Sequence, residues 1–437
     1  MAPDHPGAEV PPREAPRRFP RTFAELGGIF YGWKMVAVVS FLIAVMSLGV
    51  FQGVGTYLVA LERQFGWSRT ALSGAFAFSR VQGAAIGPVE GFLIDRFGCR
   101  RMIIIGFSIM GAGFIFLSRT EELWQFYLGF IILTLGSGLG GWLACVTIVN
   151  NWFIRRRSIA MSSAMSGIHI AGLLVSVLAL AVDKFGFHNA TLGIGVFVLL
   201  VCLPMTKFIR NRPEEYGLQP DGNIAPSLTG GPEAYAREPD FTAREALRTR
   251  AFWIIAFVHL SSSVAIVSLA LHLVPKLTDM GMSLSSAGIV VLTYTAIALP
   301  SQTVAGYVAD RMPKTAAIFV FIAFQAAGIM VIALADSVPM VYLFAVLYGI
   351  GFGGRVPLLT AIRGDYFGRK SFATIMGLSQ LPNNIGMIVA PLFAGYMFDT
   401  TGSYLIPFSV FAGLTALGGV VIWFASPPKV PMSSVRS

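Results

Sequence analysis

Charged residues are scarce in this chain. Asp, Glu, Lys and Arg make up 12% of its 437 residues, about half of the roughly 25% that soluble globular proteins carry. So few charges cannot cover the water-exposed surface of a soluble protein of this size. The composition therefore excludes a soluble enzyme. It also argues against a nucleic-acid partner, although the formal net charge is +10.

Residues that carry chemistry are equally few. The three cysteines, Cys99, Cys145 and Cys202, have neither metal-ligand spacing nor a disulfide pairing pattern. No Gly-Lys dipeptide occurs, so the chain lacks the glycine-rich phosphate loop of ATP hydrolases. The apolar segments hold no paired carboxylates, no histidine cluster with metal spacing and no nucleophile next to a base. We therefore expect no enzymatic activity, no use of ATP, no metal and no cofactor.

Long apolar runs are what the chain does contain, since 55% of its residues are hydrophobic. A helix needs about twenty apolar residues to cross roughly 30 Å of hydrocarbon. Only α-helices and closed barrels satisfy their backbone hydrogen bonds in lipid, and these runs are too long for barrel strands. The sequence predicts an all-α membrane protein with twelve transmembrane helices, at residues 34–60, 70–93, 101–118, 123–149, 158–182, 190–208, 252–275, 284–308, 315–335, 340–362, 372–398 and 404–425.

Positive charge distinguishes the two sides of the predicted bundle. With the N-terminus assigned to the cytoplasm, 25 of the 32 Lys and Arg residues fall in cytoplasmic segments and 5 in outer connections. Cytoplasmic loops of membrane proteins are enriched in Lys and Arg. We therefore expect a multi-pass protein of the cytoplasmic (inner) membrane with both termini in the cytoplasm. This placement also accounts for the basic charge without any nucleic acid.

The chain contains an internal duplication. The glycine-rich string 136–141 is matched by 349–354 at an offset of 213, and 91–96 is matched by 306–311 at an offset of 215. Two related six-helix halves that share a midplane site are an architecture of secondary transporters. The predicted divisions are a cytoplasmic N-terminal tail at 1–33, a first six-helix bundle at 34–208, a cytoplasmic central loop at 209–250, a second six-helix bundle at 251–425 and a C-terminal tail at 426–437.

The loop between the second and third spans carries a motif that reads Gly91-x-Leu93-x-Asp95-Arg96-x-Gly98-x-Arg100-Arg101. A degenerate second copy lies at 306–314, between the eighth and ninth spans. This motif resembles the loop motif of the major facilitator superfamily. With twelve spans and this motif, the chain is identified as a member of that superfamily, which implies two pseudo-symmetric six-helix bundles.

A finer resemblance rests on strings at 31–33, 152–157, 212–217, 220–222, 251–253, 272–275, 365–369 and 402–404. Together these strings resemble the bacterial monocarboxylate-transporter-like and oxalate/formate-antiporter-like branch. This resemblance implies a small carboxylate as the transported substrate. The chain departs from the branch in helix eight, where animal-type monocarboxylate transporters carry an Asp–Arg pair and this chain has Ala298 and Gln302.

The loop motif also implies a gate. In the superfamily its charge cluster latches the two halves together in the outward-open state, and Glu90, one turn earlier, is expected to join it. The alternative is that these cations only mark topology. The residues assigned to gating by the resemblance are Asp95, Arg96, Arg100, Asp310 and Arg311.

Two arginines fall inside predicted spans, Arg80 in the second and Arg355 in the tenth. An Arg at the membrane centre costs roughly 2.5–3.5 kcal/mol on insertion scales, so each requires a hydrated cavity or an anion. A guanidinium binds a carboxylate through two parallel hydrogen bonds. One Arg in each half therefore suits a small anionic substrate bound between the halves. The alternative is that each Arg bonds helix-end carbonyls or extends to the interface.

Polar residues within the spans supply further candidates. Tyr57, Gln302, Asn383 and Asn384 carry neutral groups that can hydrogen-bond a carboxylate, or that can pack helix against helix. His169 and His272 are candidates for proton coupling because imidazole titrates near neutral pH. An intramembrane histidine can equally serve as an interhelical hydrogen-bonding group.

These observations predict a secondary active transporter that moves a small organic anion, a monocarboxylate first of all, by alternating access with proton symport. The alternatives are a carboxylate/carboxylate exchanger, a drug or metabolite efflux carrier, and, from a different class, a membrane sensor that transports nothing. The expected partners are the carboxylate, protons and the lipid bilayer. We expect a monomer.

Overall fold

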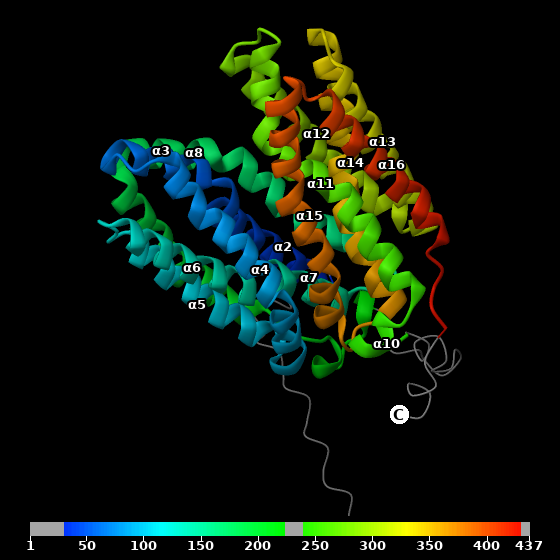
Figure 1. The fold of residues 1–437 in the computed structure, drawn as a ribbon. Helices are drawn as coiled ribbons and strands as arrows, with labels where there is room; N and C mark the ends of the chain where they lie inside the picture. Colours follow the sequence, from blue (N-terminus) through cyan, green and yellow to red (C-terminus); the bar gives the residue numbers. More distant parts are fainter. Residues whose placement is uncertain (1–29, 223–238, 430–437) are drawn as a thin grey trace, which may run out of the picture.

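The computed structural model describes residues 30–222 and 239–429, apart from a few side chains in two helices, among them that of Arg80. Every regular element in these ranges is helical, so the prediction of an all-α protein is confirmed for the described part of the chain (Figure 1). The helices form two groups, one from each half of the sequence, which lean against each other along part of their length.

The N-terminal half comprises six membrane crossings. The first is a bent helix that contains a short π-helical segment, which divides α2 from α3. The elements of this half are α2 (Tyr31–Met46), η1 (Ser47–Gln52), α3 (Val54–Phe65), α4 (Arg69–Phe97), α5 (Cys99–Leu117), α6 (Leu123–Gly140), α7 (Trp142–Trp152), α8 (Arg157–Phe197), η2 (Val198–Cys202), α9 (Leu203–Met205) and η3 (Thr206–Phe208).

Element α8 supplies two of these crossings. Its 41 residues would form a rod of about 62 Å, twice the thickness of the hydrocarbon core. Gly186 interrupts it with φ 79° and ψ 164°, a conformation open to glycine because it has no Cβ. The chain therefore reverses at Gly186 and returns to the end of the bundle from which it started.

The C-terminal half comprises the other six crossings, each one continuous helix. Short 3-10 turns (η4, Glu214–Tyr216; η5, Pro220–Gly222) and α10 (Ala243–Leu247) lie between the halves in sequence. The helices are α11 (Arg250–Asp279), α12 (Leu284–Ala309), α13 (Lys314–Leu334), α14 (Val338–Phe367), α15 (Phe372–Thr401) and α16 (Leu405–Val421), which ends in η7 (Ile422–Phe424).

Length and composition alone identify nine membrane-crossing helices among the described residues. One of the nine is the bent segment Arg157–Phe208, which crosses twice. Helices α4 and α15 complete the set of twelve. They are the two helices through which the halves contact each other most extensively on one side, so their faces hold small residues in place of bulky apolar ones.

Helix starts follow local rules in the sequence. Ser68, Thr249 and Ser283 each precede a helix, and each side-chain oxygen accepts a hydrogen bond from the backbone N–H three residues later. Such caps satisfy N–H groups that have no partner within the helix.

The glycine-rich strings allow neighbouring helices to pack closely. A Cβ at Gly136 would lie 2.5 Å from the Met110 nitrogen, so α6 can approach α5 this closely only with glycine at that position.

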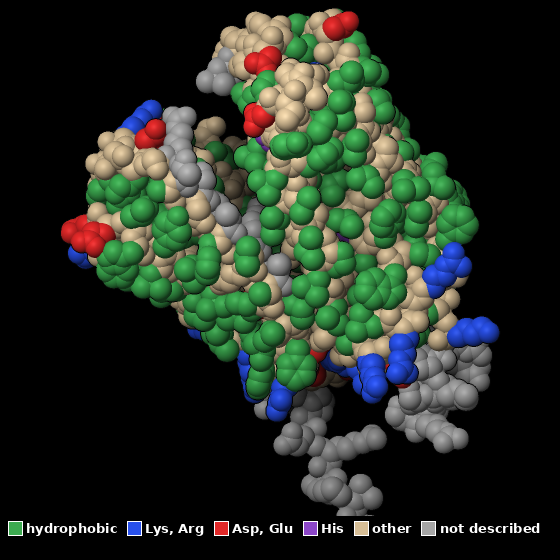
Figure 2. All heavy atoms as spheres, viewed as in Figure 1, with side chains coloured by type: hydrophobic (Ala, Val, Ile, Leu, Met, Phe, Trp, Pro, Cys, Tyr) green, Lys and Arg blue, Asp and Glu red, His purple; other side chains and the backbone are tan. Residues whose placement is uncertain are grey.

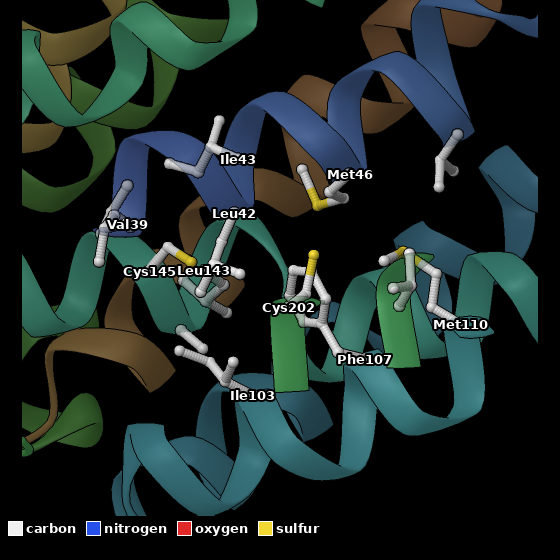
Figure 3. Packing of buried hydrophobic residues seen from close by; sticks show 14 of the residues in the cluster. Val39, Leu42, Ile43, Met46, Ile103, Phe107, Met110, Leu143, Cys145 and Cys202 are labelled. Atoms are coloured by element: carbon white, nitrogen blue, oxygen red, sulfur yellow. The ribbon is translucent and has the colours of Figure 1, made fainter. Parts of the chain in front are cut away.

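The core of the N-terminal half is aliphatic and sulfur-rich. Figure 3 shows residues of α2, α5 and α7 interdigitating with Cys202 of η2. All three cysteines are buried as free thiols. The residues labelled in Figure 3 are Val39, Leu42, Ile43, Met46, Ile103, Phe107, Met110, Leu143, Cys145 and Cys202.

The two halves meet along α4 with α15 and along α8 with α12. The lower end of the bundle in Figures 1 and 2, where α8 starts and α12 and α14 end, carries most of the Lys and Arg side chains in view and is called the basic end below. There the halves are in contact. At the opposite end the space-filling view shows a notch between them (Figure 2).

Candidate functional site

Asp95, at the last turn of α4, bonds the start of α15 in the other half. Its carboxylate accepts hydrogen bonds from the backbone nitrogens of Ala373 at 3.2 Å and Thr374 at 2.8 Å, and from the Thr374 hydroxyl at 2.6 Å. Backbone N–H groups at a helix start lack intrahelical partners and carry partial positive charge. The carboxylate therefore joins the two halves at the basic end.

Asp310 repeats this arrangement in the opposite sense. It caps the end of α12, and its carboxylate accepts hydrogen bonds from the backbone nitrogens of Ser158 at 2.9 Å and Ile159 at 3.1 Å, at the start of α8. Donors and acceptor are each displaced by 215 residues from Asp95, Ala373 and Thr374. The two contacts are therefore related by the internal duplication. We call this pair of contacts the latch.

Glycines allow the latch helices to come close. A Cβ at Gly91 would lie 2.7 Å from the Ala373 carbonyl carbon, and a Cβ at Gly306 would lie 2.8 Å from the Ile159 Cα. These two glycines again correspond at an offset of 215. Backbone cannot move away from such contacts as the tip of a side chain can, so glycine is required where α4 meets α15 and where α12 meets α8.

The arginines assigned to gating lie differently. Arg96 is exposed and stacks on Phe92 and Phe97 of its own helix. Arg311 is exposed, donates to the Tyr307 carbonyl at 3.0 Å and lies over the Tyr307 ring. Neither makes a hydrogen bond to the other half among the described residues. Arg100 is half-buried, and its backbone nitrogen donates to Asn211. The aspartates therefore form the contacts between the halves, because the helix starts facing them already supply positive charge.

A buried ion pair adds a third contact at the basic end. Arg157, 1% exposed, lies 2.6 Å from a carboxylate oxygen of Asp365 in α14, and Lys314 of α13 lies 2.5 Å from the other oxygen. Asn150 of α7 also donates to the Gly368 carbonyl beyond α14. The basic end is thus closed by bonds from both halves.

The segment after η3 extends this closure. Asp221 accepts hydrogen bonds from the backbone nitrogens of Ile154, Arg155 and Arg156, which holds the turn that leads into α8. Glu214 of the same segment pairs with Arg369 at 2.7 Å, on the C-terminal half. These are residues of the strings that resemble the carboxylate-transporter branch.

A polar cluster lies farther from the basic end, along the contact between the two halves. Gln302 of α12 is 2% exposed, donates to the Ser162 carbonyl of α8, and shares a side-chain hydrogen bond with His169. The His169 ring packs edge-on against Phe352 of α14, with 5.6 Å between ring centroids. The fold therefore brings together two of the candidates, His169 and Gln302, from opposite halves.

Arg355 lies fully buried in the C-terminal half, between α14 and α11. Its guanidinium donates to the hydroxyls of Ser262 at 2.8 Å and Ser263 at 3.2 Å, and its Nε has no hydrogen-bond partner. Among the described residues no carboxylate pairs with it. Gln325 of α13 holds the same turn of α11 by donating to the Ser262 carbonyl.

A second buried arginine adjoins this site. Arg363, 1% exposed, donates to the Leu359 carbonyl and lies 3.1 Å from the His259 ring nitrogen. The described residues contain no carboxylate paired with it either. The interior of the C-terminal half therefore holds two guanidinium groups without a neutralising acid. Sequence reasoning placed Arg363 beyond the tenth span, but α14 continues to Phe367.

The remaining candidates lie apart from this region. Tyr57 is buried in the N-terminal half against Phe187, and its hydroxyl has no partner. His272, half-buried on α11, forms hydrogen bonds with the Tyr404 hydroxyl and the Pro391 carbonyl, so it joins helices of one half.

The two asparagine candidates lie side by side on α15. Asn383 is buried, with its amide near Gln380 and Met387, and Asn384 is half-buried. Their helix α15 is continuous across Pro382.

Helix α4 carries two further residues singled out from the sequence, Arg80 and Glu90. The helix carries Arg80 in its middle, but the Arg80 side chain lies outside the described part of the structure. Glu90 was expected to join the charge cluster of the loop motif, but it does not. It is 9% exposed and lies against Gly138 of α6, and among the described residues no hydrogen bond or cation reaches its carboxylate. Its position on the helix turns it inward, away from Asp95.

Sequence reasoning missed Ser262, Ser263 and Gln325, which hold Arg355 and its surroundings. A run of three serines at 261–263 within an apolar helix was the available signal, because such hydroxyls in a span commonly bond across helices. It also missed Thr374, because this residue lies 279 residues from Asp95 and no sequence motif includes both.

The sequence model of the Major Facilitator Superfamily matches residues 39–326 and 260–436 of this chain. Among curated proteins, monocarboxylate transporter 11 of Homo sapiens is 27% identical over 420 residues, covering 92% of this chain and 84% of that protein. Monocarboxylate transporter 12-B of Danio rerio is 23% identical over 418 residues, covering 90% and 87% respectively.

Solved structures agree on the fold. FucP, a major facilitator superfamily transporter crystallised in the outward conformation, matches with a TM-score of 0.71 at 15% identity, covering 91% of this chain and 100% of FucP. The human organic anion transporter MFSD10 matches with a TM-score of 0.66 at 16% identity, covering 90% and 99%. At these identities the likeness concerns the fold alone, and it confirms the prediction of twelve spans in two six-helix bundles.

Proposed function

Because this chain belongs to the major facilitator superfamily as a transporter of monocarboxylate-transporter-like type, we propose that it carries a small organic anion, a monocarboxylate first of all, across the cytoplasmic membrane by alternating access. Relatives named as monocarboxylate transporters align over about nine-tenths of the chain, which supports this class of substrate. A transporter fold of this kind argues for translocation and against chemical conversion of the substrate.

The burial of Arg355 without an acidic partner is the observation that best supports an anionic substrate. Burying an unpaired guanidinium is costly, and this one is fully buried with only two serine hydroxyls as partners and a free Nε. A carboxylate would complete its hydrogen bonds and neutralise its charge. Arg363, which contacts His259 of α11, is a second positive charge in the same half. Arg80 remains a candidate for the N-terminal half of the site.

The latch supports alternating access. Opening the basic end requires Asp95 and Asp310 to release the helix starts of the opposite half, while the other end already shows a notch. Cytoplasmic segments of membrane proteins are rich in Lys and Arg, so we assign the basic end, and with it both termini, to the cytoplasm. The conformation is then outward-facing, with the inner side of the transporter closed.

Proton symport is the proposed coupling. Importing an anion against a negative interior costs about 2.3 kcal/mol per charge for each 100 mV, and a proton carried along cancels that charge. His169 is the better placed of the two histidines, because it contacts Gln302 and Phe352 across the boundary that must open. Glu90 is a further candidate, as a buried carboxyl without a cation on a helix of the latch. Exchange of one carboxylate for another is the alternative.

The test is transport by purified protein in liposomes, with labelled lactate, pyruvate, formate and oxalate offered with and without an imposed pH gradient. We expect uptake driven by an acidic exterior. Counterflow without a gradient would favour exchange, and absence of flux for all four acids would contradict carboxylate transport. Arg355→Gln is expected to reduce uptake roughly 10- to 150-fold, the value of a charged hydrogen bond. Arg248→Gln, an exposed residue beside α10, is the matched control.

A further inference from the structure

A cavity of about 430 Å³ opens at the basic end where the two halves meet. It is formed by the starts of α2 and α8 from the N-terminal half and by the end of α12 from the C-terminal half. Three arginines and two aromatic residues surround it. Its lining consists of Trp33, Arg155, Arg156, Ile159, Tyr307, Asp310 and Arg311.

An apolar groove of about 630 Å³ begins at the same tryptophan and follows α2 and α8 away from the basic end. Along α2 and the start of η1 it extends from Trp33 to Leu48, about 22 Å at the helical rise. One leaflet of a bilayer is roughly 15 Å of hydrocarbon. Its α8 wall includes Leu174 and Phe197, which are 40% and 42% exposed and so face the bilayer. The groove therefore spans the leaflet on the basic side.

The arginines of the cavity have unused binding capacity. Arg155 and Arg156 are exposed, and their backbone nitrogens donate to Asp221, but neither guanidinium has a hydrogen bond or ion pair among the described residues. Arg311 donates to a backbone carbonyl and stacks on Tyr307. Asp310, the one acid in the lining, is already engaged by the start of α8. The cavity therefore has an excess of positive charge at the depth of lipid headgroups.

We propose that this cavity and groove together bind one anionic phospholipid, with its phosphate on Arg155, Arg156 and Arg311 and an acyl chain along α2 and α8. Basic pockets between transmembrane helices on the cytoplasmic side suit anionic headgroups. Trp33 and Tyr307 are of the residue types that concentrate at the membrane interface. A soluble anion would use the arginines but leave the adjoining groove empty, so the continuous shape favours a lipid.

The site has a consequence for the conformational cycle. Arg155 and Arg156 belong to the N-terminal half, whereas Arg311 belongs to the C-terminal half, next to the Asp310 contact of the latch. A phosphate bound by all three holds the halves together at the basic end. Anionic lipid therefore stabilises the conformation closed at that end, independently of which substrate is carried.

The experiment uses full-length protein purified from vesicles of phosphatidylcholine alone or mixed with phosphatidylglycerol, and counts retained lipids by native mass spectrometry. We expect one phosphatidylglycerol to be retained in preference to phosphatidylcholine, and thermal stability to rise with it. Arg311→Gln and the double variant Arg155→Gln/Arg156→Gln are expected to weaken retention about fivefold for each arginine removed. Arg101→Gln, which removes an exposed charge at the start of α5 away from the cavity, is the matched control and should retain the lipid.

A second variant separates the groove from the charges. Ala37→Trp fills the exposed groove wall on α2 while all three arginines remain, and it is expected to lose the lipid. Equal retention of both lipids by the wild type, equal losses in Arg101→Gln and Arg311→Gln, or full retention by Ala37→Trp would each overturn the proposal. So would stabilisation by inorganic phosphate equal to that by phosphatidylglycerol. Circular dichroism and gel filtration verify that each variant is folded, and these readouts do not depend on transport.

Discussion

Replacing Asp95 by Asn tests the latch most directly. Asn has nearly the same volume, but it carries no charge and has one acceptor oxygen in place of two. The Asp95 carboxylate accepts three hydrogen bonds from Ala373 and Thr374. Hydrogen bonds to charged groups contribute about 1.5–3 kcal/mol each, and water replaces part of this when the helix start is released. Since solvent reaches this half-buried group, we expect the whole contact to contribute about as much as one such bond, a shift of about 1.5–3 kcal/mol.

Such a change moves the equilibrium between closed and open basic ends by roughly 10- to 150-fold. The assay is double electron–electron resonance between spin labels at Arg101→Cys on α5 and Arg248→Cys beside α10, both exposed. All three native cysteines are buried, so they compete little for the label. We expect one short distance in the starting protein and a second, longer population in Asp95→Asn.

Asp399→Asn serves as the control, because this exposed acid lies at the end of α15 far from its start at the latch. It should leave the distance distribution unchanged. If Asp95→Asn also left it unchanged, the carboxylate would not hold the halves together. The latch would then be reduced to helix packing at Gly91 and its counterpart.

Three further outcomes follow from the same geometry. Asp310→Asn should change the free energy between closed and open basic ends by a similar amount, and the double variant with Asp95→Asn by the sum, because the two contacts share no partner; a double variant no different from either single one would show that the two contacts act as one unit, which the loss of either releases. Gly91→Val should favour an open basic end in the same resonance assay, since its side chain would meet the α15 backbone; an unchanged distribution would refute the close-packing argument. Gln302→Leu removes the neutral partner of His169, so it should diminish proton-driven uptake while counterflow persists, and equal loss of both would assign Gln302 to the substrate.

Agreement between sequence and structure is best where the physics is local. The length of each apolar run reflects the thickness of the bilayer, so run length alone predicted the spans. Less local features were predicted less well. Arg363 was placed outside the tenth span because a charge there reads as a loop, whereas buried contacts with His259 and Leu359 keep it within α14.

By itself, the sequence determined the number of spans, their division into two related halves and the side that carries positive charge, because each depends on run length, repetition or composition. Only the tertiary structure decided which polar groups meet. Asp95 faces a helix start 279 residues later and His169 meets Gln302 of the other half, while Arg96 and Glu90 turn away from the partners expected for them. The rotation of each helix against its neighbours sets these pairings, and that rotation is decided by close packing between residues far apart in the chain.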